Sequence, residues 1–177
     1  MKLHIGCGEK IFPGWTNLDI DELPGVDIID DARTLSKIPN ESCDIIYACH
    51  VFEHLGRHEV ENVLKVWNTK LVKNGILRLA VPDFEKAISW YKENPNLEDI
   101  LGLLIGGQKT NFDYHKMIFD KTYLSTLLTK TQFYDIQEWD WHSVEHGEID
   151  DYSQAYLPHM DKENGMLMSL NIQAKKK

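Results

Sequence analysis

Short apolar runs alternate with helical patterns along the chain, and this alternation limits the possible fold more than any other feature. Runs typical of β-strands lie at residues 3–5, 16–20, 26–29, 44–48, 76–81, 134–141 and 166–174. Patterns typical of helices lie at residues 57–72, 85–91, 97–105 and 121–131. Strands that alternate with helices are typical of a mostly parallel sheet covered by helices. The pattern therefore predicts an α/β fold with a doubly wound, seven-stranded sheet that ends in an antiparallel hairpin.

The connections between the first three strand runs are unusually short. Residues 9–15 leave room for one or two helical turns at about 1.5 Å per residue, and residues 21–25 leave room for none. We therefore expect a reduced N-terminal half with few of the usual helices. Two helix boundaries are also predicted: Asn74-Gly75 ends the helix that begins near residue 57, and Asp120 caps the last helix.

Size and composition narrow the class of protein. The 177 residues predict a single domain, and the formal net charge of −9 disfavours nucleic acid as a partner because an acidic surface repels phosphates. No run approaches the ~20 apolar residues that cross a bilayer, so no membrane partner is expected. The three cysteines form no Cys-x-x-Cys pair, and the start of the chain has no signal-peptide pattern. These features favour a cytoplasmic protein without disulfides or structural zinc.

The first strand run ends in a glycine-rich turn, Gly6-Cys7-Gly8. A Gly-x-Gly turn after a strand lets the backbone bend sharply and approach a ligand closely. Ile11 stands where a dinucleotide fingerprint has its third glycine, beside the helix that receives a pyrophosphate. The turn therefore favours a ligand without phosphates over NAD.

Acidic residues follow the second and third strand runs. Asp19 ends the second run, where a carboxylate can accept both hydrogen bonds of a ribose diol. After the third run, we assign Asp31 and the backbone N–H of Ala32 to an adenine ring, and Asp30 to capping a helical turn. Taken singly, each of these residues is also compatible with an ordinary strand-end turn.

A histidine-containing loop, residues 47–54, follows the fourth strand run. In an open α/β sheet, ligands bind beyond the carboxyl ends of the strands, at the point where the strand order reverses. Gly6, Asp19, Asp31 and His50 would all converge there. This convergence indicates a binding site more strongly than any one of the residues.

With these motifs in place, the chain resembles the class I, Rossmann-like methyltransferases that use S-adenosylmethionine. The resemblance rests on LHIGCGEKIFPGWTNLDI, DARTLSKIPNESCDIIYACHVFEHL and NGILRLAVPD, and is nearest to a group of small bacterial and phage predicted methyltransferases. It is strong over residues 3–84, weakens through residues 106–128 and returns at residues 169–171. It implies one methyltransferase domain over residues 1–177, with residues 1–84 as the cofactor-binding half and residues 85–177 as the acceptor side.

The resemblance also implies roles for single residues. Gly6, Cys7 and Gly8 match the loop under the methionine part of the cofactor. Asp19 and Ile20 match the ribose-binding acid and its apolar neighbour, and Asp31 and Ala32 match the adenine contacts. His50 matches the position that faces both the sulfonium and the acceptor, and Glu53-His54 matches a recurrent pair after that loop. S-adenosyl-L-homocysteine would be the product.

Methyl transfer requires chiefly that the acceptor be aligned with the methyl carbon, and an oxygen or nitrogen acceptor can also need a proton removed. Histidine suits that task near neutral pH. His50 is the first candidate base and His115 the second, and the alternative for both is an ordinary histidine without a role. The expected acceptor is a small molecule, with a sugar or sugar nucleotide suggested by the family's frequent link to surface saccharides. The aromatic residues at 139–142 and 152–156 are interpreted as packing, and a homodimer is left open.

Three other functions compete with this one. His50, Glu53 and His54 spell His-x-x-Glu-His, which on a helix could bind Zn²⁺ as in a zinc hydrolase, but His50 directly follows a strand run. No metal is therefore assigned to the site, while a structural or modulatory metal near Glu53 and His54 stays open. A nucleic-acid methyltransferase is disfavoured because residues 48–51 lack an Asn/Asp-Pro-Pro-Tyr stretch. A non-catalytic cofactor-binding module or inactive partner subunit is the remaining alternative, because a fold does not fix a function.

Overall fold

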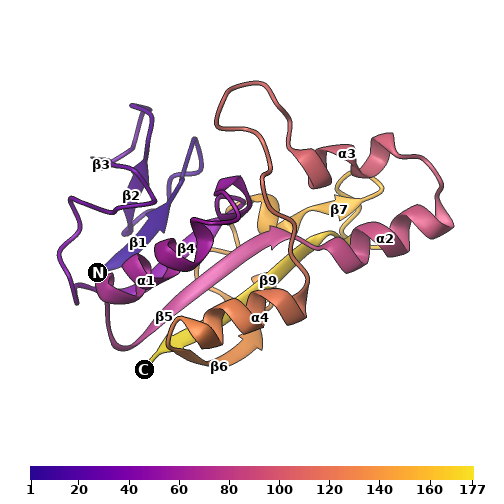
Figure 1. Cartoon of the computed structure of the whole chain (residues 1–177). Coiled ribbons are helices and arrows are strands. Elements are labelled where there is room, and N and C mark those ends of the chain that lie inside the picture. Colours follow the sequence, from indigo (N-terminus) through magenta and orange to yellow (C-terminus); the bar gives the residue numbers. More distant parts are fainter.

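The computed structural model describes residues 1–177, in which seven strands form one sheet in the order β3-β2-β1-β4-β5-β9-β6 (Figure 1). The first five strands are parallel, and β9 is antiparallel to both β5 and β6. The bounds are β1 Lys2–Ile5, β2 Thr16–Asp19, β3 Ile28–Ile29, β4 Cys43–Cys49, β5 Leu71–Pro82, β6 Phe133–Glu138 and β9 Ser169–Lys176. The predicted doubly wound sheet with a closing antiparallel pair is confirmed, and the last strand lies between β5 and β6.

All four α-helices follow β4 in the chain. They are α1 Val60–Lys70, α2 Phe84–Glu93, α3 Glu98–Ile105 and α4 Lys121–Lys130, and none combines the length and apolar character needed to cross a bilayer. Short 3₁₀ turns form at η1 Phe52–His54, η2 Trp141–Ser143 and η3 Tyr152–Gln154, and β7 Tyr156–Leu157 pairs with β8 Met166–Leu167. No α-helix lies between β1 and β4, so the reduced N-terminal half is confirmed; residues 9–15 form turns without a helix.

One predicted helix end is wrong. The helix α1 ends at Lys70, and Asn74-Gly75 lies inside β5, where the pairing with β4 shifts its register. A Cβ atom on Gly75 would lie 2.9 Å from the carbonyl oxygen of Val72 and 3.1 Å from that of Cys43. The glycine is therefore required by a crowded irregularity of the strand and not by a helix terminus. The predicted cap of α4 is confirmed, because the Asp120 carboxylate accepts a hydrogen bond from the backbone N–H of the third helical residue over 2.6 Å.

One face of the sheet is covered by α1 and α4. Alternate residues of the strands point to that face, so Leu3 and Ile5 of β1 are buried there together with Ile46 and Ala48 of β4. The helices contribute an apolar stripe at helical spacing, which consists of Val60, Val63, Leu64, Trp67, Leu124, Leu127 and Leu128. This face holds the main hydrophobic core.

Aromatic side chains, not helices, cover the opposite face of the sheet at β1 and β4. Tyr47 of β4 lies at the centre, with its ring centroid 5.5 Å from that of Phe12, 5.9 Å from Trp139 and 4.2 Å from His146. These partners come from the β1–β2 connection and from the segment after β6. Two loops thus perform the covering that helices perform in a full doubly wound fold. The predicted packing role is confirmed for Trp139, which is 7% exposed, but is wrong for Tyr152, which is 68% exposed.

Candidate functional site

The turn after β1 lies against the loop that follows β4. Gly6 has φ +64°, and a Cβ atom on it would lie 2.3 Å from Cγ2 of Val51. Gly8 also has positive φ, at +51°, and no atom lies within 4 Å of its Cβ position. The two glycines therefore differ: Gly6 is required by close packing, and Gly8 leaves open space beside the backbone.

Asp19, at the end of β2, is held by two backbone donors. The N–H of Gly8 donates to Oδ2 over 2.7 Å, and the N–H of Asp21 donates to Oδ1 over 3.0 Å. A carboxylate oxygen has two lone pairs, so each oxygen can accept one more hydrogen bond. Ile20, which follows it, is 39% exposed and offers an apolar surface beside the carboxylate.

Cys7, between the two glycines, turns its side chain into the core. Its thiol is buried, and burial raises the pKa of Cys7 to about 12, with the carboxylate of Asp19 acting in the same direction. Its backbone N–H donates to the carbonyl of Leu18 over 3.1 Å. Only the backbone of Cys7, and not its thiol, is therefore available to a ligand that lies against the turn.

The two aspartates after β3 have different partners. Asp30 accepts hydrogen bonds from the backbone N–H of Lys37 over 2.7 Å and from the Ser36 hydroxyl over 2.9 Å. Asp31 accepts from the backbone N–H of Arg33 over 2.8 Å and forms an ion pair with its guanidinium over 3.0 Å. The expected capping role of Asp30 is therefore wrong: Asp30 ties the two ends of this loop together, and the capping-type hydrogen bond, from the N–H two residues on, belongs to Asp31.

Only one of the two backbone polar groups of Ala32, its carbonyl, is hydrogen-bonded within the chain. Its carbonyl accepts a hydrogen bond from Nε1 of the buried Trp67 over 2.7 Å, which ties this loop to α1. Its own N–H makes no hydrogen bond within the chain. The donor that the sequence assigns to an adenine ring is therefore free.

His50 follows β4 with a strained backbone and an unsatisfied ring. Its φ is +52°, a region that non-glycine residues rarely adopt. Nδ1 lies 3.1 Å from Oε1 of Glu53, within ion-pairing range but not aligned for a hydrogen bond, and Nε2 is buried without a partner. The ring of Tyr152, which is 68% exposed, lies over it with 5.3 Å between ring centroids. Positive φ in a bulky residue, together with an unpartnered ring nitrogen, is typical of functional positions.

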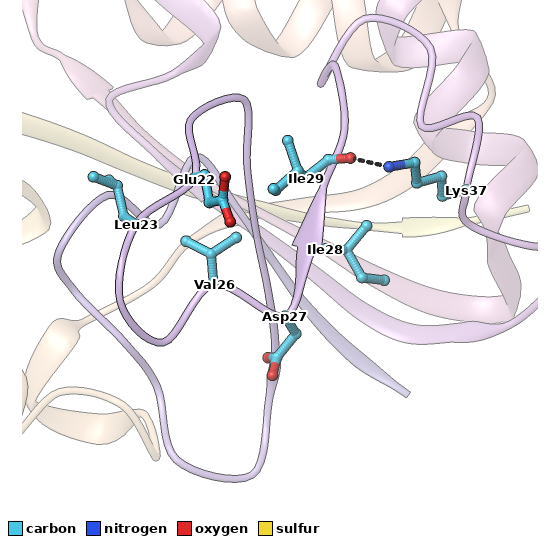
Figure 2. Close-up of a pocket in the computed structure, with 7 residues that line it drawn as sticks. All are labelled: Glu22, Leu23, Val26, Asp27, Ile28, Ile29 and Lys37. Carbon is cyan, nitrogen blue, oxygen red and sulfur yellow. Dashed lines mark hydrogen bonds between the residues drawn. The ribbon is translucent and has the colours of Figure 1, made fainter.

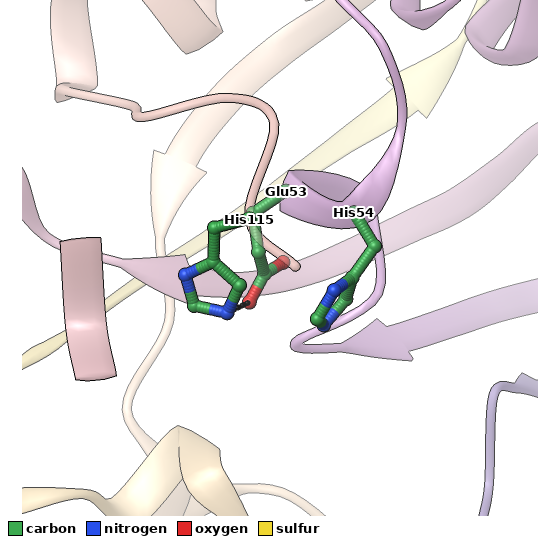
Figure 3. A group of neighbouring side chains, drawn as sticks. All are labelled: Glu53, His54 and His115. Carbon is green, nitrogen blue, oxygen red and sulfur yellow. Dashed lines mark ion pairs between the residues drawn. The ribbon is translucent and has the colours of Figure 1, made fainter. Parts of the chain in front are cut away.

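Glu53 is fully buried and surrounded by histidines. Figure 3 shows its carboxylate between the rings of His54 and His115, and Nε2 of His115 lies 3.8 Å from its Oε1. Burial acts to raise the pKa of Glu53, but the neighbouring His50 and His54 outweigh it and lower this pKa. Burial lowers the pKa of His115, despite the opposing charge of Glu53.

The structure therefore brings both candidate bases, His50 and His115, to one carboxylate. Sequence reasoning missed that Glu53 is the centre of this cluster. The close spacing of His50, Glu53 and His54 in the sequence indicated a cluster of polar side chains, but His115 joins them only through the tertiary fold.

The geometry required for the zinc-hydrolase alternative is absent. Residues 50–54 follow the end of β4 and comprise a residue with positive φ and a three-residue 3₁₀ turn, so His50 and His54 do not share the face of an α-helix. The donor atoms that come together belong to Glu53, His54 and His115. The structure thus argues against the zinc-hydrolase alternative, for the reason already given by the strand that precedes His50.

A hollow that none of these residues lines is shown in Figure 2. It measures about 430 Å³ and is formed by the β2–β3 connection, the edge strand β3 and Lys37, whose ammonium donates to the carbonyl of Ile29 over 2.6 Å. None of the predicted site residues lines it. The hollow is a consequence of the helix-free N-terminal half, which leaves the sheet edge at β3 uncovered.

Comparison with solved structures places this geometry in a known fold. A S-adenosylmethionine-dependent methyltransferase from Archaeoglobus fulgidus is 18% identical, with a TM-score of 0.59 over 99% of this chain and 85% of that one. A protein from Thermotoga maritima, described as a possible histamine N-methyltransferase, is 18% identical, with a TM-score of 0.63 over 99% and 82%. This chain has the class I methyltransferase fold.

A third neighbour with the class I fold was solved with ligands. It is the 1,6-didemethyltoxoflavin-N1-methyltransferase of Burkholderia thailandensis, with 1,6-didemethyltoxoflavin and S-adenosylhomocysteine bound; it is 13% identical, with a TM-score of 0.60 over 99% of this chain and 70% of that one. No family model and no curated protein sequence matches the chain. At these identities the comparisons establish the class I fold, and the strand order reverses between β1 and β4, the kind of switch point at which open α/β sheets bind ligands.

Proposed function

We propose that the chain binds S-adenosylmethionine at the carboxyl ends of β1 to β4 and transfers its methyl group to a small-molecule acceptor. The observation that carries this proposal is Asp19. Its carboxylate is fixed at the end of β2 by the N–H of Gly8, and both of its oxygens retain a lone pair for a ribose diol. When bound, the cofactor supplies a methyl group on a sulfonium, which is already a good leaving group.

The remaining contacts fit the cofactor part by part. The open space beside Gly8 allows a ligand to lie against the turn, which Gly6 and the backbone of Cys7 continue. Ile20 offers an apolar surface, and the free N–H of Ala32 offers a donor to the adenine ring. Asp31 can accept from an adenine amino group only by sharing its carboxylate with Arg33.

On the acceptor side, His50 is better placed than His115 to remove a proton. Nε2 of His50 has no partner, and Glu53 lies next to its other ring nitrogen. Nε2 of His115 instead faces Glu53, so His115 is enclosed by the cluster. A small polar acceptor such as a sugar or sugar nucleotide would present a hydroxyl to His50, which would accept its proton. The small-molecule substrate bound by the Burkholderia neighbour supports this size of acceptor.

The cofactor proposal is tested by calorimetric titration with S-adenosylhomocysteine, with NAD as the control ligand. We expect binding of the sulfur compound and none of NAD. Asp19→Ala should abolish binding, whereas Asp21→Ala, two residues away and exposed, should not, because only the backbone of Asp21 contacts Asp19. A folded wild-type chain that does not bind, or an Asp19→Ala variant that binds as well as the wild type, would refute the proposal.

Catalysis is tested by transfer of a labelled methyl group to a panel of sugars, sugar nucleotides and small amines. We expect His50→Ala to keep its affinity for S-adenosylhomocysteine and to lose about 10²–10⁴ in rate, the usual contribution of a general base. His58→Ala, an exposed neighbour, serves as the control. Tight cofactor binding without transfer to any acceptor would instead favour the non-catalytic binding module.

A further inference from the structure

A carboxylate and two imidazoles meet beyond the end of β4, and we propose that Glu53, His54 and His115 bind a divalent transition-metal ion. One ligand atom of each residue lies within 4.8 Å of the others, and Figure 3 shows the two rings on either side of the Glu53 carboxylate. Glu53 and His54 come from η1, whereas His115 comes from the segment between α3 and α4. The proposal does not depend on methyl transfer, because it concerns only these three side chains.

The first argument is the state of Glu53. Its side chain is 0% exposed, and neither carboxylate oxygen has a hydrogen-bond partner. Burial of a carboxylate without partners is strongly unfavourable, so such a group is normally paired or bound to a metal. The nearest cationic candidate, Nδ1 of His50 at 3.1 Å, is not aligned for a hydrogen bond. A metal ion between the three side chains would give the carboxylate the bond that the geometry of His50 does not provide.

The second argument is the orientation of the two imidazoles. Nδ1 of His115 lies 3.0 Å from the carbonyl oxygen of Leu103, and Nδ1 of His54 lies 3.2 Å from that of Tyr114. A carbonyl can only accept, so each Nδ1 carries a proton and each neutral ring keeps its lone pair on Nε2. Metal-ligating histidines are held in this way, with the second ring nitrogen fixed by a backbone carbonyl.

The third argument concerns which ion fits. Two imidazole nitrogens and one carboxylate oxygen suit Zn²⁺, Co²⁺, Fe²⁺ or Ni²⁺, whereas Mg²⁺ and Ca²⁺ prefer oxygen ligands. Bonds of about 2.0–2.1 Å place ligand atoms roughly 3.0–3.4 Å apart around one ion. Nε2 of His115 and Oε1 of Glu53 are 3.8 Å apart, so a small side-chain rotation would bring them into range. Three protein ligands leave coordination positions open for water or for an oxygen of a bound molecule.

The test is a titration of the full chain, without a polyhistidine tag and after treatment with a chelator, with Co²⁺ as the probe. Calorimetry and visible absorption should show one equivalent of Co²⁺ bound, and Co²⁺ should raise the thermal unfolding midpoint. Glu53→Gln and His54→Ala should each weaken binding by at least about tenfold, because loss of a ligand exceeds the effect of losing a supporting contact. His58→Ala, an exposed histidine four residues further on, should bind as the wild type does.

Three results would overturn the proposal: a folded wild-type chain that binds no Co²⁺, a His54→Ala variant with unchanged affinity, or loss of binding in His58→Ala. His54 is partly exposed, so its substitution should leave the fold intact, and circular dichroism checks this directly. His54→Ala therefore remains decisive even if substitution of the buried Glu53 prevents folding.

Discussion

The hydroxyl of Tyr47 donates a hydrogen bond to Oδ2 of Asp151 over 2.6 Å, between residues 104 positions apart in the chain. Both side chains are buried. The bond ties β4 to the segment after β6 that covers the helix-free face of the sheet. Burial keeps the pKa of Tyr47 well above its ordinary range, so the phenol stays protonated and remains a donor.

We expect Tyr47→Phe to reduce the free energy of unfolding by about 1–3 kcal/mol, because Oδ2 of Asp151 would be left buried without a donor. Urea denaturation measures this change. Tyr134→Phe is the control: its hydroxyl also donates to a side chain, Asn74, but it is 38% exposed and water can replace it. Equal losses of unfolding free energy in the two variants would contradict a larger contribution from the buried hydrogen bond.

Gly6 and Gly14 provide a matched pair for the turn after β1. Both have positive φ, at +64° and +76°, so alanine at either position should cost about 1–2 kcal/mol in backbone strain. At Gly6 the new Cβ atom would also clash with the branched side chain of Val51, whereas Gly14 has open space. Gly6→Ala should therefore lose about 1–3 kcal/mol more than Gly14→Ala, the usual cost of overpacking.

The same pair tests the cofactor site. Gly6→Ala should also weaken S-adenosylhomocysteine binding, because the displaced loop forms part of the proposed contact, while Gly14→Ala should not. Calorimetry on folded variants measures both. Unchanged affinity in Gly6→Ala would place the cofactor elsewhere.

Buried histidines predict how stability depends on pH. Burial lowers the pKa of His146 from 6.5 to about 4, with Arg78 beside it acting in the same direction, and burial also lowers the pKa of His4 to about 4. The unfolded chain binds these protons near pH 6.5, but the folded chain does not. Stability is thus fully present above about pH 6.5 and is lost as the pH falls towards 4.

Between pH 7 and 5, unfolding free energies from urea denaturation should fall by about 1–2 kcal/mol for each of these histidines. His146→Gln should flatten this dependence, because an amide does not titrate but can still accept from Arg78. His159→Gln, at an exposed position, should retain the full slope. A wild-type chain that gains stability towards pH 5 would contradict the prediction.

Much of the fold could be predicted because hydrophobic periodicity is local. The strands at Leu3, Leu18, Ile46 and Leu79 alternate or run apolar within a few residues, and the parallel order then follows from the alternation with helices. The end of α1 could not be predicted, because Gly75 is required by a contact with Cys43 in a neighbouring strand. The aromatic cover of the second face is equally non-local, since Tyr47 and Trp139 meet only in the folded chain.

The candidate site also has one part that could be predicted from the sequence and one that could not. Gly6, Asp19 and His50 could be predicted to converge, because parallel strands end at one edge of the sheet and each residue lies at the end of a strand or directly after it. The cluster at Glu53 could not, because His115 reaches it from a loop more than 60 positions away with no periodic pattern. The ion pair between Asp31 and Arg33 was also missed, although the two are separated by one residue, because nothing in the pattern fixes the direction of an arginine side chain.

That ion pair leads to a prediction about adenine recognition. If Asp31 accepts a hydrogen bond from the adenine amino group, the wild type should bind S-adenosylhomocysteine more tightly than its inosine analogue, which lacks that donor. The expected difference in affinity is at least about tenfold, which corresponds to about 1.4 kcal/mol. Asp31→Ala should bring the two affinities together. Glu59→Ala removes the other acidic neighbour of Arg33, at 3.7 Å, and should leave the discrimination intact. Calorimetry with both ligands measures the ratio, and discrimination that survives in Asp31→Ala would assign the adenine amino group to another acceptor.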